Sequence, residues 1–217
     1  LPTGTEARFE NTQTLQNIFT RITGDLPSDI DGILSAGGRA NLFLLNPNGI
    51  VFGENAQLTL GGSFFATTAD SLEFGNGSQF SATLPENVPL LSMSTPTGLQ
   101  YGSNPGDLVN RSRSQLPDIP QNSIGTPPGL AVRPGRTLVL AGGNLHLEGG
   151  NLAAFGGRIE LGSVTDSGTV RLIPNPDGWQ LNYDNIDRFG TIRLSNETVV
   201  DVSGIPPATP NQPGGNV

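Results

Sequence analysis

A seven-residue repeat between residues 142 and 162 limits the folds that are open to this chain. Each unit begins with two glycines and continues with a short segment of alternating apolar residues, and the three units are 142–148, 149–155 and 156–162. Paired glycines disfavour helix, so the repeat does not indicate a coiled coil. Three corners and three short strands make a circuit of about twenty residues, which is what one turn of a three-sided parallel β-helix needs.

The stretch from residue 33 to residue 80 alternates apolar and polar residues with period two, in strands of three to five residues. Glycine pairs and Asn-Gly steps separate these strands at intervals of roughly seven to ten residues, which leaves no room for helices between them. In a β-helix, Leu145, Leu152 and Ile159 would point inward, and His146 and Glu160 would point outward. A flat sandwich built from hairpins is the alternative for the same pattern. The apolar pairs are Leu42 and Leu44, Ile50 and Phe52, Leu58 and Leu60, Phe64 and Ala66, and Leu72 and Phe74.

A different spacing occurs near the beginning of the chain. Leu15, Ile18, Phe19 and Ile22 follow the i, i+3, i+4, i+7 pattern, which predicts a short amphipathic helix ended by Gly24 and a turn. Such a helix would be a cap over the open edge of the sheets, or a docking helix for a partner.

Prolines crowd the stretch from residue 85 to residue 134 and predict an excursion from the regular coils. We expect a hairpin there that carries Leu90, Leu91, Met93, Leu99 and Tyr101, followed by a long surface loop at 110–129. We therefore expect one all-β domain, residues 1–203, and a flexible linker at 204–217 after which the natural protein continues. Within the domain we expect a cap at 1–32, first coils at 33–84, the Pro-rich excursion at 85–131 and later coils at 132–203.

The composition argues against several partners. The 217 residues carry a formal net charge of −8, and every basic residue is an arginine. An acidic protein repels nucleic acids and anionic membranes. The absence of cysteine excludes disulfides and thiolate metal sites, and it fits export through a narrow pore. The sequence has no apolar run of about 18 residues, so we expect no membrane span.

The sequence contains no compact catalytic or metal motif. His146 is the only histidine and is interpreted as a solvent-facing strand residue. Asp25, Asp29 and Asp31 cluster, yet they lack the glycine and terminal glutamate of an EF-hand calcium loop. We therefore predict no catalytic residues, no metal and no cofactor. A β-helix enzyme that degrades polysaccharides is the alternative, and its groove would be built from Asp166, Asp177, Asp184, Asp187, Arg171 and Arg188.

An explicit turn lies between two apolar segments at residues 41–53. Pro47 fixes φ near a turn value, Asn48 tolerates a left-handed backbone, and Gly49 accepts positive φ. The chain must bend sharply between Asn46 and Ile50.

This turn, together with residues 17–24 and 61–69, resembles the secretion domain of filamentous-haemagglutinin-like two-partner secretion exoproteins, also called the haemagglutination activity domain. Residues 147–152 and 156–164 resemble the continuation in cyanobacterial-type members. The resemblance implies a right-handed parallel β-helix with an N-terminal cap and side hairpins. It also implies export by the Sec route, recognition in the periplasm by the POTRA domains of an Omp85-superfamily outer-membrane pore, and folding at the cell surface.

From this resemblance we expect the N-terminal secretion module of a large exoprotein or adhesin, monomeric, not an enzyme, and secreted or held at the bacterial cell surface. A host or cell-surface glycan or protein would be bound by the downstream region. The expected recognition residues are Asn46, Pro47, Asn48 and Gly49, with Ile50 beginning the next strand, although the same residues could form a corner without partner contact. The family's opening strands precede Leu1, and its Asn-Pro-Asn-Leu motif is replaced by residues 24–29. A free-standing glycan-binding adhesin is a further alternative.

Overall fold

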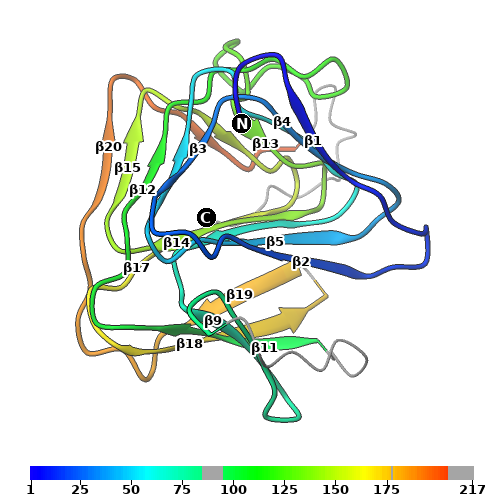
Figure 1. The fold of residues 1–217 in the computed structure, drawn as a ribbon. Coiled ribbons are helices and arrows are strands. Elements are labelled where there is room, and N and C mark those ends of the chain that lie inside the picture. The colour runs from blue at the N-terminus through cyan, green and yellow to red at the C-terminus, as the bar shows by residue number, and fades with distance from the viewer. Residues whose placement is uncertain (85–94, 177, 205–217) are drawn as a thin grey trace.

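A computed structural model describes residues 1–84, 95–176 and 178–204 of the chain. Over these residues the protein is all-β and contains no helix (Figure 1). Parallel strands form three sides around a common interior, and an antiparallel sheet lies outside one of these sides. The described residues contain no helix that could cross a membrane.

The three sides are named sheets 1, 2 and 3. Sheet 1 has the order β2 (Asn17–Arg21), β5 (Asn41–Leu45), β8 (Phe64–Thr67), β14 (Thr137–Gly142), β17 (Arg158–Ser163). Sheet 2 has the order β3 (Ser28–Ile30), β6 (Ile50–Phe52), β12 (Leu108–Asn110), β15 (Leu145–Glu148), β20 (Ile192–Ser195). Sheet 3 has two parts, β1 (Glu6–Phe9), β4 (Ile33–Ala36), β7 (Gln57–Thr59) and β13 (Leu130–Ala131), β16 (Leu152–Ala153), β21 (Val200–Asp201), and β7 contacts β13.

The chain visits the three sheets in rotation. Strands β4, β5 and β6 belong to sheets 3, 1 and 2, and β7 and β8 return to sheets 3 and 1. Leu42 of β5 pairs with Phe64 of β8, and Leu138 of β14 pairs with Ile159 of β17, so each pair joins residues that are one circuit apart. The seven-residue repeats supply β15, β16 and β17 to the three sheets in turn, as the sequence predicts. Parallel pairing is not what a sandwich of hairpins gives, so that alternative is wrong for these sheets.

The antiparallel sheet is built from two excursions that leave the rotation at the same point, between a strand of sheet 1 and the next strand of sheet 2. One excursion follows β8 and the other follows β17, so both emerge on the same side of the molecule, where β11 pairs with β18. Leu99 and Tyr101 lie in this sheet as expected, whereas Leu90, Leu91 and Met93 lie outside the described residues. The order is β10 (Gln79–Ser81), β9 (Ser71–Phe74), β11 (Pro96–Tyr101), β18 (Gly168–Asn175), β19 (Gly178–Asn182).

The main core fills the space that the three sheets enclose. Leu145, Leu152 and Ile159 are fully buried there, while His146 and Glu160 are partly exposed, which confirms the predicted alternation. Burial of one such aliphatic side chain stabilises the fold by about 1.5–3 kcal/mol. Each added turn of chain therefore extends the same core.

The middle strands of sheet 1, β5, β8 and β14, are buried on both faces. Their inward residues join the main core, while Phe43, Phe65 and Val139 point outward into a second core beneath the antiparallel sheet. The rings of Phe43 and Phe65 stack with centroids 4.0 Å apart, and Trp179 of β19 meets Phe65 edge-on at 5.3 Å. Burial on both faces explains why β5 is a continuous apolar run.

A packed loop covers sheet 3. Leu116 and Ile119, within the predicted surface loop, are buried against Ala131, Ala153 and Phe155. The backbone N–H of Ser123 donates to Oδ2 of Asp201 at 2.6 Å, which ties this loop to β21. The expected linker at 204–217 lies outside the described residues except for Gly204, and the expected domain boundaries stay a prediction.

The predicted helix near residue 15 is wrong, because Asn17–Arg21 forms the edge strand β2 of sheet 1. Ile18 packs on the main core and its neighbour Phe19 packs on the second core, which consecutive residues achieve only in an extended strand. The helical spacing was misleading because Ile18 and Ile22 also fit period two. Strands therefore occupy the segment that was expected to be a helical cap.

Glycine pairs allow successive turns to lie against one another at the corners between sheets 3 and 1. A Cβ atom on Gly61 would lie 2.0 Å from the carbonyl oxygen of Gly38, and one on Gly157 would lie 2.2 Å from that of Arg136. Neither separation is possible for a side-chain atom, so these corners require glycine.

A line of polar contacts runs along the same edge of the molecule and links the turns that carry β2, β5, β8 and β14. Each contact joins a residue at the start of one strand to its counterpart one turn away. Asn41 Nδ2 donates to Asn17 Oδ1 at 2.9 Å, Ser63 N to Asn41 Oδ1 at 2.8 Å, and Thr137 N to Ser63 Oγ at 3.0 Å. These contacts fix the register of sheet 1.

We predict that Leu145→Asp lowers the free energy of unfolding by about 4 kcal/mol or more, because it places an unpaired charge in the main core. Chemical denaturation measures the change. Leu26→Asp is the matched control, because Leu26 is 76% exposed and its replacement should have little effect. Equal stability of the two variants would contradict the inward assignment.

Candidate functional site

The candidate recognition residues 46–49 form a tight turn between β5 and β6. The backbone N–H of Gly49 donates to the Asn46 carbonyl at 3.1 Å, and that of Asn48 donates to Asn46 Oδ1 at 3.0 Å. Gly49 takes the positive φ, 121°, whereas Asn48 does not adopt the left-handed backbone that it would tolerate. The predicted sharp bend is therefore present, and glycine alone supplies the unusual backbone geometry.

Asn46 is fully buried and holds three turns of chain together. Its Nδ2 donates to the Leu26 carbonyl at 3.1 Å and to Ser28 Oγ at 2.8 Å, both in the preceding turn. Its backbone N–H donates to the Thr67 carbonyl in the following turn, at 3.0 Å. This side chain has a structural role in the folded protein.

The next turn stacks directly on this one through residues that the sequence analysis did not single out. The N–H of Gly106 donates to the Pro47 carbonyl at 2.8 Å, and the N–H of Ile50 donates to the Asp107 carbonyl at 3.1 Å. A Cβ atom on Gly106 would lie 2.4 Å from the backbone of Asn48. The sequence does contain a signal for this second turn, because Asn104-Pro105-Gly106 repeats the Asn, Pro and Gly residue types of the turn at 46–49.

The stack continues through two further turns by side-chain contacts. Asp107 Oδ1 accepts from the backbone N–H and the Nδ2 of Asn144, at 2.9 and 3.0 Å. Asn144 Oδ1 in turn accepts from the N–H of Thr191 at 2.9 Å. We call residues 24–28, 46–49, 104–107, 143–144 and 190–191 the corner column.

Access to the candidate residues is limited once the chain has folded. Asn46, Gly49 and Ile50 are buried, Pro47 is half-buried and Asn48 is exposed. Asn48 Nδ2 still donates to the Gly24 carbonyl at 2.8 Å. A partner of the folded protein could therefore reach little more than Asn48 and Pro47.

One member of the predicted cluster of aspartates, Asp31, joins neighbouring turns through its side chain. Asp31 accepts hydrogen bonds from Thr3 Oγ1, from Asn55 Nδ2 at 3.0 Å and from Asn55 N at 2.8 Å. These bonds, that of Thr3 first, hold the pKa of Asp31 below its ordinary value of 3.8. The described residues contain no group of three acidic or histidine side chains that could hold a metal ion.

The residues of the alternative enzyme groove are not joined by polar contacts where the structure describes them. Asp177 lies outside the described residues, and in the described part of the chain no hydrogen bond or ion pair links any two of the remaining five. These five are Asp166, Arg171, Asp184, Asp187 and Arg188.

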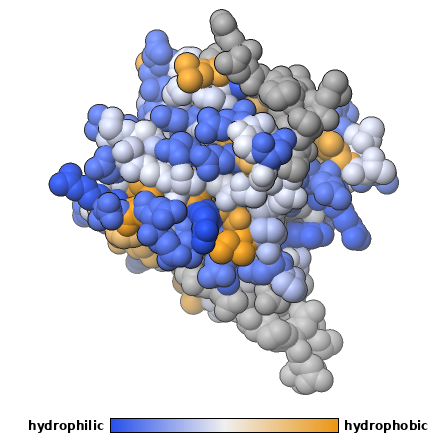
Figure 2. All heavy atoms as spheres, turned by 90° about the horizontal axis from the view of Figure 1, so that it is seen from below, coloured by the Kyte–Doolittle hydropathy of each residue, from blue (hydrophilic) through white to orange (hydrophobic). Residues whose placement is uncertain are grey.

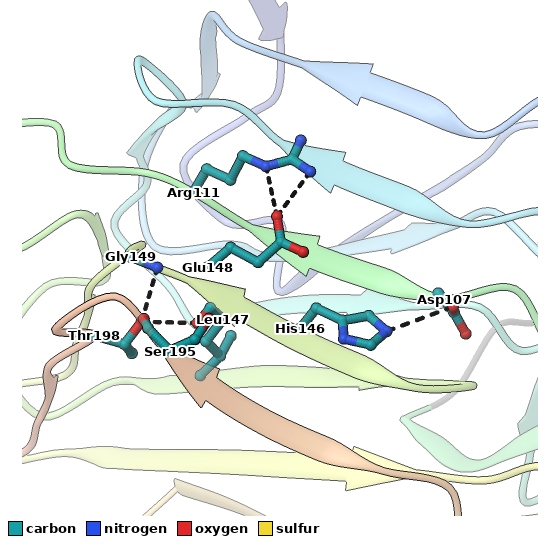
Figure 3. Close-up of polar contacts among 8 residues, drawn as sticks. All are labelled: Asp107, Arg111, His146, Leu147, Glu148, Gly149, Ser195 and Thr198. Atoms are coloured by element: carbon teal, nitrogen blue, oxygen red, sulfur yellow. Dashed lines mark hydrogen bonds and ion pairs between the residues drawn. The ribbon is translucent and has the colours of Figure 1, made fainter.

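The outer face of sheet 2 carries a set of exposed polar contacts (Figure 3). His146 Nε2 lies 3.6 Å from Asp107 Oδ2, and Arg111 makes an ion pair with Glu148 at 2.8 Å. Thr198 Oγ1 donates to the Leu147 carbonyl at 2.9 Å and accepts from the N–H of Gly149 at 3.1 Å. His146 is thus a solvent-facing strand residue, as predicted, and its neighbours join adjacent strands.

Comparisons with known proteins give one family and one curated relative. The family model described as the TPS secretion domain matches residues 1–217. The heme/hemopexin-binding protein of Haemophilus influenzae (strain ATCC 51907 / DSM 11121 / KW20 / Rd) is 33% identical over 86 residues. The similar region makes up 37% of this chain and 9% of that relative. No solved structure matches the chain.

We predict that Asn46→Ala lowers the free energy of unfolding by about 2 kcal/mol or more, because the buried Asn46 side chain loses its hydrogen bonds to the Leu26 carbonyl and the Ser28 hydroxyl in the preceding turn. Chemical denaturation of Asn46→Ala and of the exposed neighbour Asn48→Ala provides the comparison. A larger loss for Asn48→Ala would contradict the structural role of Asn46.

A second prediction concerns acid stability. Because the pKa of Asp31 is lowered in the folded state, its carboxylate stabilises the fold above its ordinary pKa of 3.8, and this contribution disappears as the pH falls through the lower folded value. Asp31→Asn should therefore flatten the dependence of melting temperature on pH below about 4. Asp25→Asn, which removes a charge but none of these hydrogen bonds, is the control, and an equal flattening there would contradict the assignment.

Proposed function

The chain belongs to the TPS secretion domain family, and from this membership we propose that it is the module through which a large two-partner exoprotein is recognised and exported. The match of the family model over residues 1–217 confirms the resemblance seen in the sequence. Exoproteins of this family are secreted across the outer membrane, so the protein reaches the cell surface or the medium, as expected.

The proposed architecture is a right-handed parallel β-helix. Its support is the rotation of the chain through three parallel sheets, with one circuit of chain between the paired strands of sheet 1. Strands of sheet 1 hydrogen-bond to the strands one circuit before and after them. In such a fold each coil needs only its neighbour in order to form.

This dependence on neighbours supports a mechanism of folding outside the cell. The chain emerges from the transporter in sequence order, and β2 to β8 can pair without residues beyond Thr67. Contacts of short sequence separation form quickly because loop closure is less unfavourable. The first coils then template the later ones.

The burial of the Asn46-to-Ile50 turn carries the proposal for recognition. Three of its five residues are inaccessible in the folded protein, so a transporter that reads this turn must read it before folding. We assign that step to the POTRA domains of an Omp85-superfamily pore, which would bind residues 15–80 in the periplasm while they are unfolded.

Ligand binding by the whole exoprotein belongs to its downstream region in this proposal. The curated relative is named for binding heme and hemopexin, but the similar part is only 9% of that protein. In this exoprotein the downstream region, and not the secretion module, would bind a host or cell-surface glycan or protein. The module itself acts as a monomer, without a cofactor and without catalysis.

We predict that the double variant Pro47→Ala/Asn48→Ala lowers export through the cognate pore by about tenfold, because neither side chain is buried and both belong to the proposed recognition turn. Secreted protein is quantified by immunoblot, and binding of the urea-unfolded chain to purified POTRA domains is measured in parallel.

The control is Asn104→Ala/Pro105→Ala, which changes the same residue types at the next level of the corner column with similar exposure. Its export and POTRA binding should remain within about twofold of the unmodified chain, because it lies outside the proposed recognition segment. Equal losses of export and POTRA binding in both variants would contradict the recognition role and leave the turn with a role in folding alone.

A further inference from the structure

Three arginines gather around a hollow at the corners between sheets 3 and 1. The hollow has a volume of about 530 Å³, and its lining includes Arg39, Arg133, Arg136, Thr59 and Gly61. The protein has 11 basic residues against 19 acidic ones, so three arginines around one hollow are a local reversal of its overall charge.

The stacking of turns determines how two of these arginines are spaced. Arg39 precedes β5 and Arg136 precedes β14, and β8 lies between them in sheet 1. Two strand spacings separate the two positions by roughly 10 Å. The intermediate turn contributes Gly61, where a Cβ atom would lie 2.0 Å from the Gly38 carbonyl oxygen. The intermediate turn must therefore have glycine at this position, and no side chain from position 61 can fill the space between Arg39 and Arg136.

The arginine charges in the hollow are not neutralised within the protein. Among the described residues, the side chains of Arg39 and Arg136 make no hydrogen bond or ion pair. Arg133 makes an exposed pair with Asp118 at 3.5 Å, and such pairs are weak. Neighbouring Arg158 differs, since Glu160 compensates its charge. An oxyanion between Arg39 and Arg136 could accept hydrogen bonds from both guanidinium groups.

A second hollow of about 420 Å³ adjoins the first, because Arg39 and Arg136 line both. It adds the side chains of Gln13, Asn17 and Asn41 and the indole of Trp179, which is 8% exposed. The amide of Gln13 can donate and accept hydrogen bonds, as hydroxyl-rich ligands require, while Asn17 and Asn41, whose Oδ1 atoms already accept from Asn41 and Ser63, keep N–H groups that can donate. An indole offers an apolar contact with one polar N–H.

We propose that this double hollow binds an acidic sugar, with its sulfate, phosphate or carboxylate group over Gly61 and its ring toward Asn41 and Trp179. Hollows of these volumes are suited to a small ligand group, such as a sugar ring, rather than to the flat surface of a larger molecule. Figure 2, seen from the side of the antiparallel sheet, shows a largely hydrophilic face with small, separate hydrophobic patches. Through this double hollow the module would bind acidic polysaccharide at the cell surface or in the medium, and this binding would be separate from its role in export.

Binding of the purified, folded chain to sulfated dextran and to unsulfated dextran, measured by calorimetry, tests the proposal. Saturable binding of the sulfated polymer alone is expected, and Arg39→Ala/Arg136→Ala should weaken it about tenfold or more. Arg171→Ala/Arg193→Ala is the matched control, since it removes the same charge from exposed arginines elsewhere and should change affinity by less than about twofold. Arg39→Lys/Arg136→Lys keeps the charge but loses the planar fork, so it should bind more weakly than the unmodified chain.

Equal weakening in the alanine and control variants would overturn the proposal, because it would reveal a general charge effect. Equal binding of both dextrans would overturn it as well. If the chain binds vesicles that contain phosphatidylglycerol more tightly than it binds sulfated dextran, the proposal is overturned and the hollow is assigned to a membrane surface. If thermal melting shows that the double alanine variant does not fold, Arg39→Gln and Arg136→Gln replace it singly under the same criteria.

Discussion

The close approach of one turn's backbone to the next is the constraint on which this structure depends. At Gly61 and Gly157 the carbonyl oxygen of the neighbouring turn occupies the place where a side chain would begin. Turns can then stack at the spacing of hydrogen-bonded strands on all three sides at once. The contacts from Asn17 through Asn41 to Thr137, and those of the corner column, set the register. The apolar interior follows from that register, because each strand then places its alternate residues inward.

The same constraint connects the fold to secretion. A protein whose turns depend on their immediate neighbours can form progressively as it leaves a pore. Asn46 illustrates the connection, because it bonds to both the preceding and the following turn and is inaccessible once they are in place. A residue of this kind can be available to a transporter before folding and can stabilise the stack afterwards. The two proposed roles of the Asn46-to-Ile50 turn thus belong to successive states of one chain.

The sequence predicted those features that depend on local patterns. Glycine pairs and alternating leucines revealed the all-β class, the inward positions of Leu145 and Leu152, and the sharp bend at Gly49. It misassigned residues 15–22, because Ile18 and Ile22 satisfy a helical and an extended period equally well and only pairing with β5 decides between them. It could not reveal that β11 pairs with β18, since two turns of chain, β12 to β17, separate Leu99 from its partner Val170. The arginine hollow was missed for a similar reason, because Arg39 and Arg136 meet only through stacking.

The order of stacking can be measured on sheet 2, where Asp29, Val51, Val109, His146 and Arg193 lie in register on the outer face. The chain contains no cysteine, so cysteines introduced in pairs carry spin labels at defined positions only. With one label at Asp29, electron paramagnetic resonance should give distances that increase in steps of about 5 Å for partners at Val51, Val109, His146 and Arg193. A label at Arg193 that lies as close to Asp29 as one at Val51, or distances in any other order, would contradict the stacked arrangement.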